Sequence, residues 1–446
     1  MKFPQSPVLY ANYTCLLSEK EYNGRDKLQM EGSSLSKLRF RRPVIESAWL
    51  QFTVLQFVYW FVMAIGNYQT VYLQSRGYTA STIGLINAVL SAVTIMATPV
   101  WGMISDRIRS IRKVFLLTLI VGSVLFAFIP AIIGLPVLSA PLMLIYLSLV
   151  YFFRNPANAL MDNWLVRYSN QKGVDYGSIR SFGSLGFAIC GVVIAGAVSS
   201  FGTAWTFPVC SALMALVVVM SLRTDDAKPA APVTDAAADA PAREAFNPLT
   251  LFKNYYFTTF LVFAFLLCIV INSAAAFLPY LLEDVGVSSS RYGVITAYMA
   301  TLEIPMLLAA RPLRRRAPLY ALCIASGFSY AAACLLLGTC AHSLGMIVAI
   351  ETLSGVGSGL LIASAANYIY TLTPENLKAT GQSIYVAATA LSGIAGNLIG
   401  GAVVDALSAP LLYCIMGVTG LISALFLLGT IVIGAKLLKR TPPERA

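Results

Sequence analysis

The sequence predicts an all-α polytopic membrane protein with twelve transmembrane helices in two six-helix halves. The 446-residue chain is 58% hydrophobic and only 11% charged, with a mean hydropathy of +0.74. A soluble domain carries about 25% charged residues. Apolar runs of roughly 20 residues, the length that crosses a bilayer, follow one another along most of the chain. A polar segment near the middle divides these runs into two sets.

The first set predicts an N-terminal six-helix bundle over residues 48–222. A polar segment, residues 1–47, precedes it and is expected to be a cytoplasmic tail. The apolar runs lie at 48–73, 81–104, 113–134, 142–166, 179–199 and 203–222.

The second set predicts a C-terminal six-helix bundle over residues 256–436, followed by a cytoplasmic tail at 437–446. Its runs lie at 256–281, 291–310, 318–338, 345–371, 381–404 and 411–436. Residues 223–255, rich in Ala, Pro and Asp, are expected to form a disordered cytoplasmic linker. A weak match between "YGSIRSFGSLGF" and "TGQSIYVAATALSG", which open the fifth and eleventh helices, indicates that the halves are related.

The net charge of +11 comes from basic residues in alternate loops. They recur at 37–42, 107–113, 167–172, 223–228, 311–316 and 436–440. This positive-inside pattern predicts a multi-pass protein of the cell (inner) membrane with both termini in the cytoplasm, rather than a nucleic-acid partner. One histidine and eight scattered cysteines without a CxxC pair predict no metal site, no cofactor and no enzymatic activity.

The loop "GMISDRIRSIRK" joins the second and third predicted helices and carries Gly102, Asp106 and Arg107. It resembles the loop motif of the major facilitator superfamily, in which a glycine precedes an aspartate by four residues and basic residues follow. The resemblance implies a gating role. Gly102 would permit close helix approach, and Asp106 would pair with the start of the eleventh helix or a nearby basic residue. Arg109 departs from the pattern, because the family usually has glycine there. The alternative is an ordinary basic loop.

Residues 159–187, "ALMDNWLVRYSNQKGVDYGSIRSFGSLGF", resemble one branch of that superfamily more specifically. The branch contains lactose permease, the nucleoside:proton symporters and the phenylpropionate permeases. Asp162 and Arg180 fall where lactose permease carries its sugar-binding acid and arginine. The resemblance implies that both contact a small-molecule substrate. The alternative is a pair of interfacial charges near lipid phosphates, which cost little at helix ends.

Arg154, Asn158 and Asp162 are spaced i, i+4 and i+8 on the fourth predicted helix, so they would share one face. Such a polar stripe should face a water-filled cavity rather than lipid. Asn272 on the seventh helix adds a neutral hydrogen-bonding group. We therefore predict that these residues join Arg180 in binding substrate, with interhelical hydrogen bonding as the alternative for any single amide.

Glu303 lies in "TLEIPMLLAA", in the middle of the eighth predicted helix, and Glu351 lies in the tenth, followed by Ser354 on the same face. A carboxyl group in apolar surroundings prefers its neutral form and can exchange protons with neutral solution. Both are therefore candidates for proton coupling, with a fixed ion pair between Glu303 and Arg154 as the alternative. The helix-9 arginine and helix-10 histidine of lactose permease have no counterpart here, so its proton relay is not implied.

These features predict a secondary active transporter, a monomer embedded in the lipid bilayer. The preferred prediction is a proton-coupled symporter that imports a sugar or oligosaccharide, a nucleoside or an aromatic acid by alternating access. Sodium is the alternative coupling ion. A proton-coupled efflux antiporter of the same fold is the second reading, although "GSLGFAICGVVIAGA" lacks the Gly-Pro motif typical of such exporters. A non-transporting receptor is the third.

Overall fold

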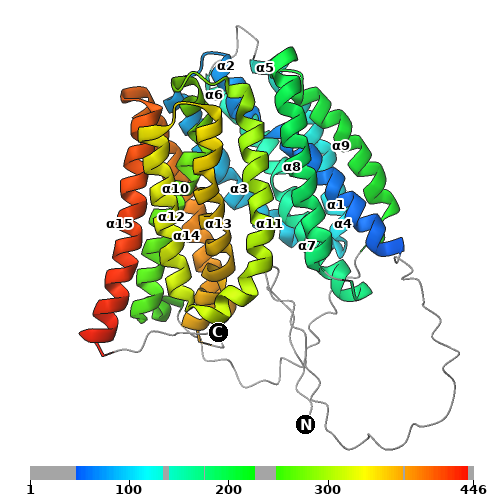
Figure 1. Ribbon diagram of the computed structural model, residues 1–446. Helices are drawn as coiled ribbons and strands as arrows, with labels where there is room; N and C mark the ends of the chain where they lie inside the picture. The colour runs from blue at the N-terminus through cyan, green and yellow to red at the C-terminus, as the bar shows by residue number, and fades with distance from the viewer. Residues whose placement is uncertain (1–46, 134–139, 175, 227–247, 375–376, 440–446) are drawn as a thin grey trace, which may run out of the picture.

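The computed structural model describes residues 47–133, 140–174, 176–226, 248–374 and 377–439. These residues form helices, and no strand occurs among them. Figure 1 shows the helices packed side by side, with the start of α1 (Ser47–Gly66) and the end of α15 (Ala409–Lys436) at the same end of the bundle. We call this end the terminal face, and the other end the opposite face.

The N-terminal half begins with α1. The elements that follow are α2 (Gln69–Ser75), α3 (Ala80–Ile108), α4 (Ile111–Ala127), α5 (Ile129–Ile133), α6 (Ala140–Arg154), α7 (Pro156–Lys172), α8 (Tyr176–Phe201) and α9 (Thr206–Arg223). The prediction of one continuous helix over 142–166 is wrong, because the helix is interrupted at Asn155. Pro156 stands at the first position of α7, where its missing N–H is tolerated, but it cannot continue α6.

The C-terminal half ends with α15. The elements before it are η2 (Pro248–Lys253), α10 (Tyr255–Asp284), η3 (Ser289–Arg291), α11 (Tyr292–Arg316), α12 (Leu319–Cys340), α13 (Leu344–Leu372) and α14 (Lys378–Ala406). In the described part of the chain, ten helical segments are long and apolar enough to cross a membrane. The other two predicted spans, 142–166 and 291–310, correspond to the interrupted pair α6–α7 and to α11, which ends in three arginines. The predicted all-α polytopic class is confirmed.

Each half has an apolar core of its own. In the N-terminal half, Phe52 of α1 packs edge-on against Trp164 of α7, with 5.2 Å between ring centroids, and both side chains are fully buried. In the C-terminal half, Phe260 of α10 packs in the same way against Tyr368 of α13 at 5.0 Å. Linker residues 227–247 and tail residues 1–46 and 440–446 lie outside the described residues, so the predicted domain boundaries stay predictions.

The two halves approach closely through glycines. On α8, a Cβ added at Gly191 would lie 2.6 Å from the backbone oxygen of Gly293 on α11. On α3, a Cβ added at Gly84 would lie 3.2 Å from the Cα of Gly401 on α14. Larger residues would push these helices apart, since no real Cβ sits so near backbone atoms.

Hydrogen bonds near the opposite face also join the halves. Asp405, at the end of α14, accepts from the backbone amides of Ala80 (2.8 Å) and Ser81 (2.7 Å) in the first turn of α3. Tyr68 accepts a hydrogen bond from the amide of Gly293 at 3.0 Å. The helix N-terminus is a favourable place for the carboxylate, because its amides lack intrahelical partners. These contacts close the molecule at the opposite face.

Candidate functional site

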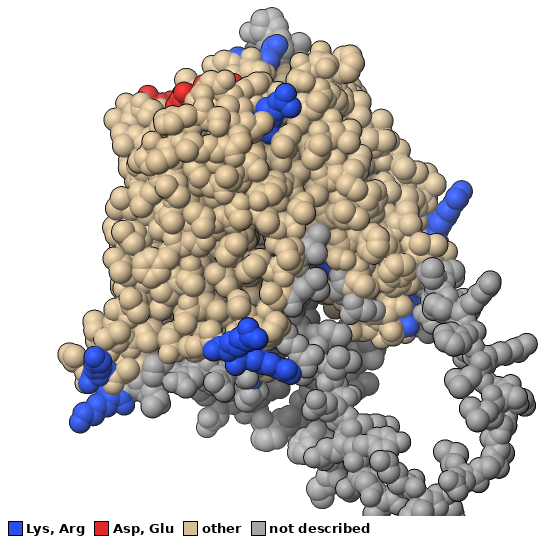
Figure 2. Space-filling view, viewed as in Figure 1, with Lys and Arg blue, Asp and Glu red and all other residues tan. Residues whose placement is uncertain are grey.

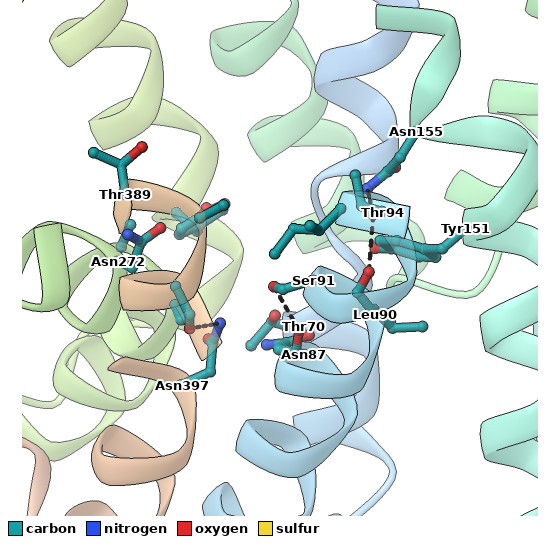
Figure 3. A pocket seen from close by; sticks show the side chains of 16 residues that line it. Thr70, Asn87, Leu90, Ser91, Thr94, Tyr151, Asn155, Asn272, Thr389 and Asn397 are labelled. Carbon is teal, nitrogen blue, oxygen red and sulfur yellow. Dashed lines mark hydrogen bonds between the residues drawn. The ribbon is translucent and has the colours of Figure 1, made fainter. Parts of the chain in front are cut away.

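A pocket of about 440 Å³ lies between the two halves. Its walls come from α2, α3 and α6 on one side and from α10, α11 and α14 on the other (Figure 3). The lining consists of Thr70, Asn87, Leu90, Ser91, Thr94, Ile95, Tyr151, Asn155, Asn272, Ala275, Ala276, Tyr292, Thr389, Ala390, Gly393 and Asn397. Each of these residues is uncharged, and ten of the sixteen carry a hydroxyl or amide group.

The wall from the N-terminal half depends on the interruption between α6 and α7. Asn155 stands between the two helices, and its side-chain nitrogen donates to the hydroxyl of Thr94 on α3, at 3.0 Å. Tyr151, one turn earlier, donates its hydroxyl to the side-chain oxygen of Gln69 at 3.1 Å. These bonds fix both side chains at the edge of the pocket (Figure 3).

The wall from the C-terminal half carries two asparagines. The side-chain nitrogen of Asn272 donates to the backbone oxygen of Cys268, and that of Asn397 donates to Gly393, both at 2.7 Å. The absence of a side chain at Gly393 leaves room beside Asn272, since an added Cβ there would lie 3.6 Å from its Oδ1. Figure 3 shows Asn272 and Asn397 across the pocket from the α3 residues.

Asp162 and Arg180 lie together but outside this lining. Arg180 Nε is 3.6 Å from Asp162 Oδ1, and the guanidinium lies 4.5 Å from the ring centre of Trp60 on α1. Both charged side chains are about one-third exposed (31% and 33%). Asn158, one turn before Asp162, accepts a hydrogen bond of 2.6 Å from the hydroxyl of Tyr59. The structure thus brings three predicted site residues to one cluster between α1, α7 and α8.

Arg154 lies in a different environment from Asn158 and Asp162, although the sequence predicts one stripe. Its guanidinium is buried inside the N-terminal half, 4.1 Å from the ring centre of Phe126. Its Nη2 lies 3.6 Å from the sulfur of Met63 and 3.8 Å from that of Cys210. No carboxylate pairs with it among the described residues. The predicted role of Arg154 beside Asn158 and Asp162 stays a prediction.

The two candidate proton-coupling residues lie on α11 and α13. Glu351 is buried, with 4% of its surface exposed, and in the described part of the chain its Oε2 has no hydrogen-bond partner. Ser354 follows it on the same helix and is also buried. Neither residue lines the pocket. The side chain of Glu303 lies outside the described residues, so its prediction stays open.

The predicted gating loop joins α3 to α4. Asp106 Oδ1 lies 3.1 Å from Arg167 Nη2 at the end of α7, which is a basic partner of the expected kind. Gly102 does not mediate close packing as expected, because an added Cβ would meet nothing within 4 Å. Arg107 is exposed in the last turn of α3. Arg109 has a left-handed φ of 55°, the conformation that favours the glycine usual in the family.

The sequence predicts Asn272 as a site residue, but it does not predict most of the other residues that line the pocket. Asn87, Ser91 and Thr94 follow the spacing i, i+4 and i+7 on α3, so the sequence carried a helical polar stripe. Small hydroxyl residues are common in membrane helices, where they bond to their own backbone. The stripe therefore did not stand out as a site.

A family model provides the decisive comparison. The MFS_1 like family matches residues 49–415, which include every pocket residue. The chain belongs to this family. It is thus a transporter of the major facilitator superfamily, and its relatives are transporters rather than enzymes.

Two curated relatives are sugar permeases. The chain is 25% identical to the maltose permease of Geobacillus stearothermophilus over 361 residues, which covers 80% of this chain and 88% of that permease. It is 28% identical to the lactose permease of Klebsiella oxytoca over 195 residues, covering 42% of this chain and 45% of that one. The second match is the more local.

Solved structures share the fold. The nucleoside transporter NupG superposes with a TM-score of 0.69 at 17% identity, covering 86% of this chain and 98% of NupG. A bacterial homologue of the human lysosomal transporter Spinster, solved in an inward-facing and occupied conformation, gives a TM-score of 0.63 at 15% identity, covering 90% and 99%. At these identities the likeness concerns the fold alone.

Proposed function

We propose that this transporter is a proton-coupled symporter that imports a small polar organic solute by alternating access. The observation that carries the proposal is the pocket between the halves, because a site lined by both halves is exposed to one face or the other as they rock. Its volume of about 440 Å³ is within the usual range for small-molecule sites. Similarity to the maltose and lactose permeases and to the nucleoside transporter NupG supports a sugar or a nucleoside as the solute.

The solute occupies the central pocket, and the cluster around Asp162 and Arg180 is a separate contact on the path that leads to it. Trp60 supports this role, because an indole face beside a guanidinium offers both an apolar platform and hydrogen-bond donors. Asn158 belongs to the same cluster. Arg154 contributes indirectly, because its contact with Phe126 holds the end of α6 in place next to α7. The hydrogen bonds between the halves close the opposite face, as expected for an inward-facing state in which the terminal face is open to the cytoplasm.

Proton coupling is assigned to Glu303 or Glu351, and sodium is the alternative coupling ion. Glu351 supports the assignment because a buried carboxyl group without a cationic partner strongly prefers its neutral form. A group that binds a proton in one state and releases it in the other links the proton gradient to transport. Glu303 is the preferred residue on the sequence alone.

The terminal face is assigned to the cytoplasm of a cell whose inner membrane holds the protein as a monomer. Figure 2 shows Lys and Arg gathered toward the terminal face and the visible acidic side chains at the opposite face. Arg76 and Arg291 are exceptions, since they stand at the opposite-face ends of α2 and η3. The majority pattern agrees with cytoplasmic positive charge.

The second candidate is an antiporter of the same fold. It would use the same pocket and the same carboxyl groups, and it would differ in the direction of solute movement relative to the proton.

Transport into proteoliposomes separates these alternatives. Purified protein is reconstituted, and uptake of radiolabelled maltose, lactose and uridine is followed under an imposed proton gradient. A symporter accumulates one of them when protons flow in the same direction. Accumulation only against the proton flow would favour the antiporter, and uptake of none of these solutes, nor of an aromatic acid such as phenylpropionate, would contradict the proposal.

A further inference from the structure

None of the sixteen residues that line the pocket carries a charge. Arg291, the neighbour of the pocket residue Tyr292, is exposed and lies outside the lining. Arg154 is the neighbour of the pocket residue Asn155, but its guanidinium contacts Phe126 and two sulfur atoms inside the N-terminal half. Arg180 is occupied by Asp162 and lies outside the lining. A carboxylate in this pocket would lose its hydration without gaining a charged partner, which is costly.

Three hydroxyl groups of the lining donate their hydrogens to the backbone of their own helix. Ser91 donates to the backbone oxygen of Asn87 at 2.7 Å, and Thr94 donates to that of Leu90 at 2.8 Å. Thr389, on the opposite wall, donates to Val386 at 2.9 Å. A hydroxyl has one hydrogen and two lone pairs, so each of these groups meets a solute as an acceptor.

The asparagine amides show the same bias. Asn272 and Asn397 donate to backbone oxygens one turn earlier at 2.7 Å, and Asn272 reaches Ser392 Oγ at 3.5 Å as well. These carbonyl partners fix the orientation of each amide, because the flipped amide would set two acceptors against each other. The Oδ1 atoms are left to face the pocket. An amide nitrogen carries two hydrogens, so Asn155 and Asn397 each keep one donor, and donors also remain on Thr70, Asn87 and Tyr292. The lining oxygens that can accept still outnumber these donors.

We propose that the pocket selects its solute by hydrogen-bond polarity: it binds an uncharged molecule through several hydroxyl hydrogens and rejects carboxylates. This inference rests on the proposed function. It narrows the proposed solutes to polyhydroxylated molecules and excludes the aromatic acids. Sugar hydroxyls match the lining, because each can donate to a hydroxyl or amide oxygen of the wall. A solute group that can only accept hydrogen bonds, such as a carboxylate, faces the lone pairs of these oxygens and finds few donors.

The test compares solutes that differ in one property. The purified full chain is titrated with maltose, with octa-O-methyl maltose, which keeps the oxygens and loses the hydroxyl hydrogens, and with maltobionate, which adds a carboxylate. Lactose, lactobionate, uridine and phenylpropionate complete the panel. Binding is measured by isothermal titration calorimetry and by the shift in unfolding temperature, since ligands stabilise the native state by mass action.

The expected result is that at least one neutral hydroxylated solute binds and that its methylated and acidic forms bind about tenfold more weakly or not at all. Binding of a methylated or acidic form within twofold of its parent overturns the inference. If phenylpropionate binds and is transported in vesicles while no neutral solute binds, the polarity inference fails and transport stands. If nothing on the panel binds and vesicles transport nothing, the proposed function fails with it.

A matched pair of variants locates the selection in the pocket. Asn272→Leu removes an acceptor from the lining, and Asn367→Leu removes an asparagine that makes the same bond to the residue four earlier, Ala363, but does not line the pocket. Asn272→Leu should weaken binding of the neutral solute about five- to tenfold, and Asn367→Leu should leave it within twofold. Equal effects of the two variants would overturn the assignment to this pocket.

Discussion

The carboxylate of Asp405, at the end of α14, accepts a hydrogen bond of 2.7 Å from the backbone amide of Ser81, in the first turn of α3. The two residues belong to different halves of the transporter, so this bond exists only while the opposite face is closed. Ser81 also donates its hydroxyl to the backbone oxygen of Gly401 at 3.2 Å. The end of α14 thus caps the start of α3 across the interface.

Asp405→Asn is expected to shift the population toward a state open at the opposite face. Loss of a capping charge at an exposed helix N-terminus costs about 0.3–1 kcal/mol, which is up to about a fivefold change in the ratio of states. Double electron–electron resonance between spin labels at positions 76 and 407 would show a larger population at long distance. The matched control is Asp284→Asn, since Asp284 caps α15 at the amide of Ala409 within one half. An unchanged distance distribution in Asp405→Asn would argue against the cap as a gate.

Gly293→Val should open the same face more strongly. The glycine packs against backbone atoms of Gly191 on α8 and against the hydroxyl of Tyr68, and a branched side chain has no space there. Overpacking of this kind costs about 1–3 kcal/mol, so the ratio of open to closed states should rise by about fivefold to a hundredfold. The control is Gly196→Val on α8, where an added Cβ meets nothing within 4 Å. If both variants behave alike, the glycine contact is not what closes the face.

Asp162→Asn and Arg180→Gln are each expected to weaken solute binding at least tenfold while leaving the unfolding temperature within a few degrees. The reason is that a pair whose side chains are one-third exposed contributes little to stability, whereas a charged group lining the solute path contributes directly to binding. Titration of the neutral solute by calorimetry measures the first effect and thermal unfolding the second. A retained dissociation constant in both variants would remove the pair from the binding site.

Glu303→Gln is expected to abolish accumulation driven by a proton gradient and to preserve exchange of solute between loaded vesicles. The amide mimics the protonated carboxyl permanently, and exchange needs no net proton release. Glu351→Gln is the direct comparison, because Glu351 is buried without an ion-pair partner in the part of the chain that the structure describes. The residue whose variant separates accumulation from exchange is the coupling residue. If Glu303→Gln still concentrates solute, the assignment to Glu303 is wrong.

The sequence predicted the helical spans well, because length and hydropathy decide where a chain can cross a bilayer. It failed to show the break within the span over 142–166, although Pro156 marks it. The prediction treated Arg154, Asn158 and Asp162 as residues of one helix, and the structure divides them between α6 and α7 at Asn155. A proline inside an apolar run is a physical signal that outweighs periodicity.

The environment of Arg154 depends on packing that the sequence does not encode locally. A side chain at Gly66 on α1 would collide with the guanidinium, and one at Gly122 on α4 would lie 2.9 Å from the backbone nitrogen of Arg154. These two glycines, far apart in sequence, open the space into which the arginine turns. By contrast, the pairing of Asp162 with Arg180 follows from the adjacency of consecutive helices, and the family resemblance pointed to it.

The central claim is that the uncharged pocket between the halves is the site of transport. Its most direct test is uptake into proteoliposomes, under an inward proton gradient, of whichever of maltose, lactose or uridine the wild-type protein transports. Asn272→Leu should reduce the initial rate at subsaturating solute about five- to tenfold, while Asn367→Leu stays within twofold of the wild type. Wild-type uptake by Asn272→Leu, with reconstitution verified as equal, would contradict the account.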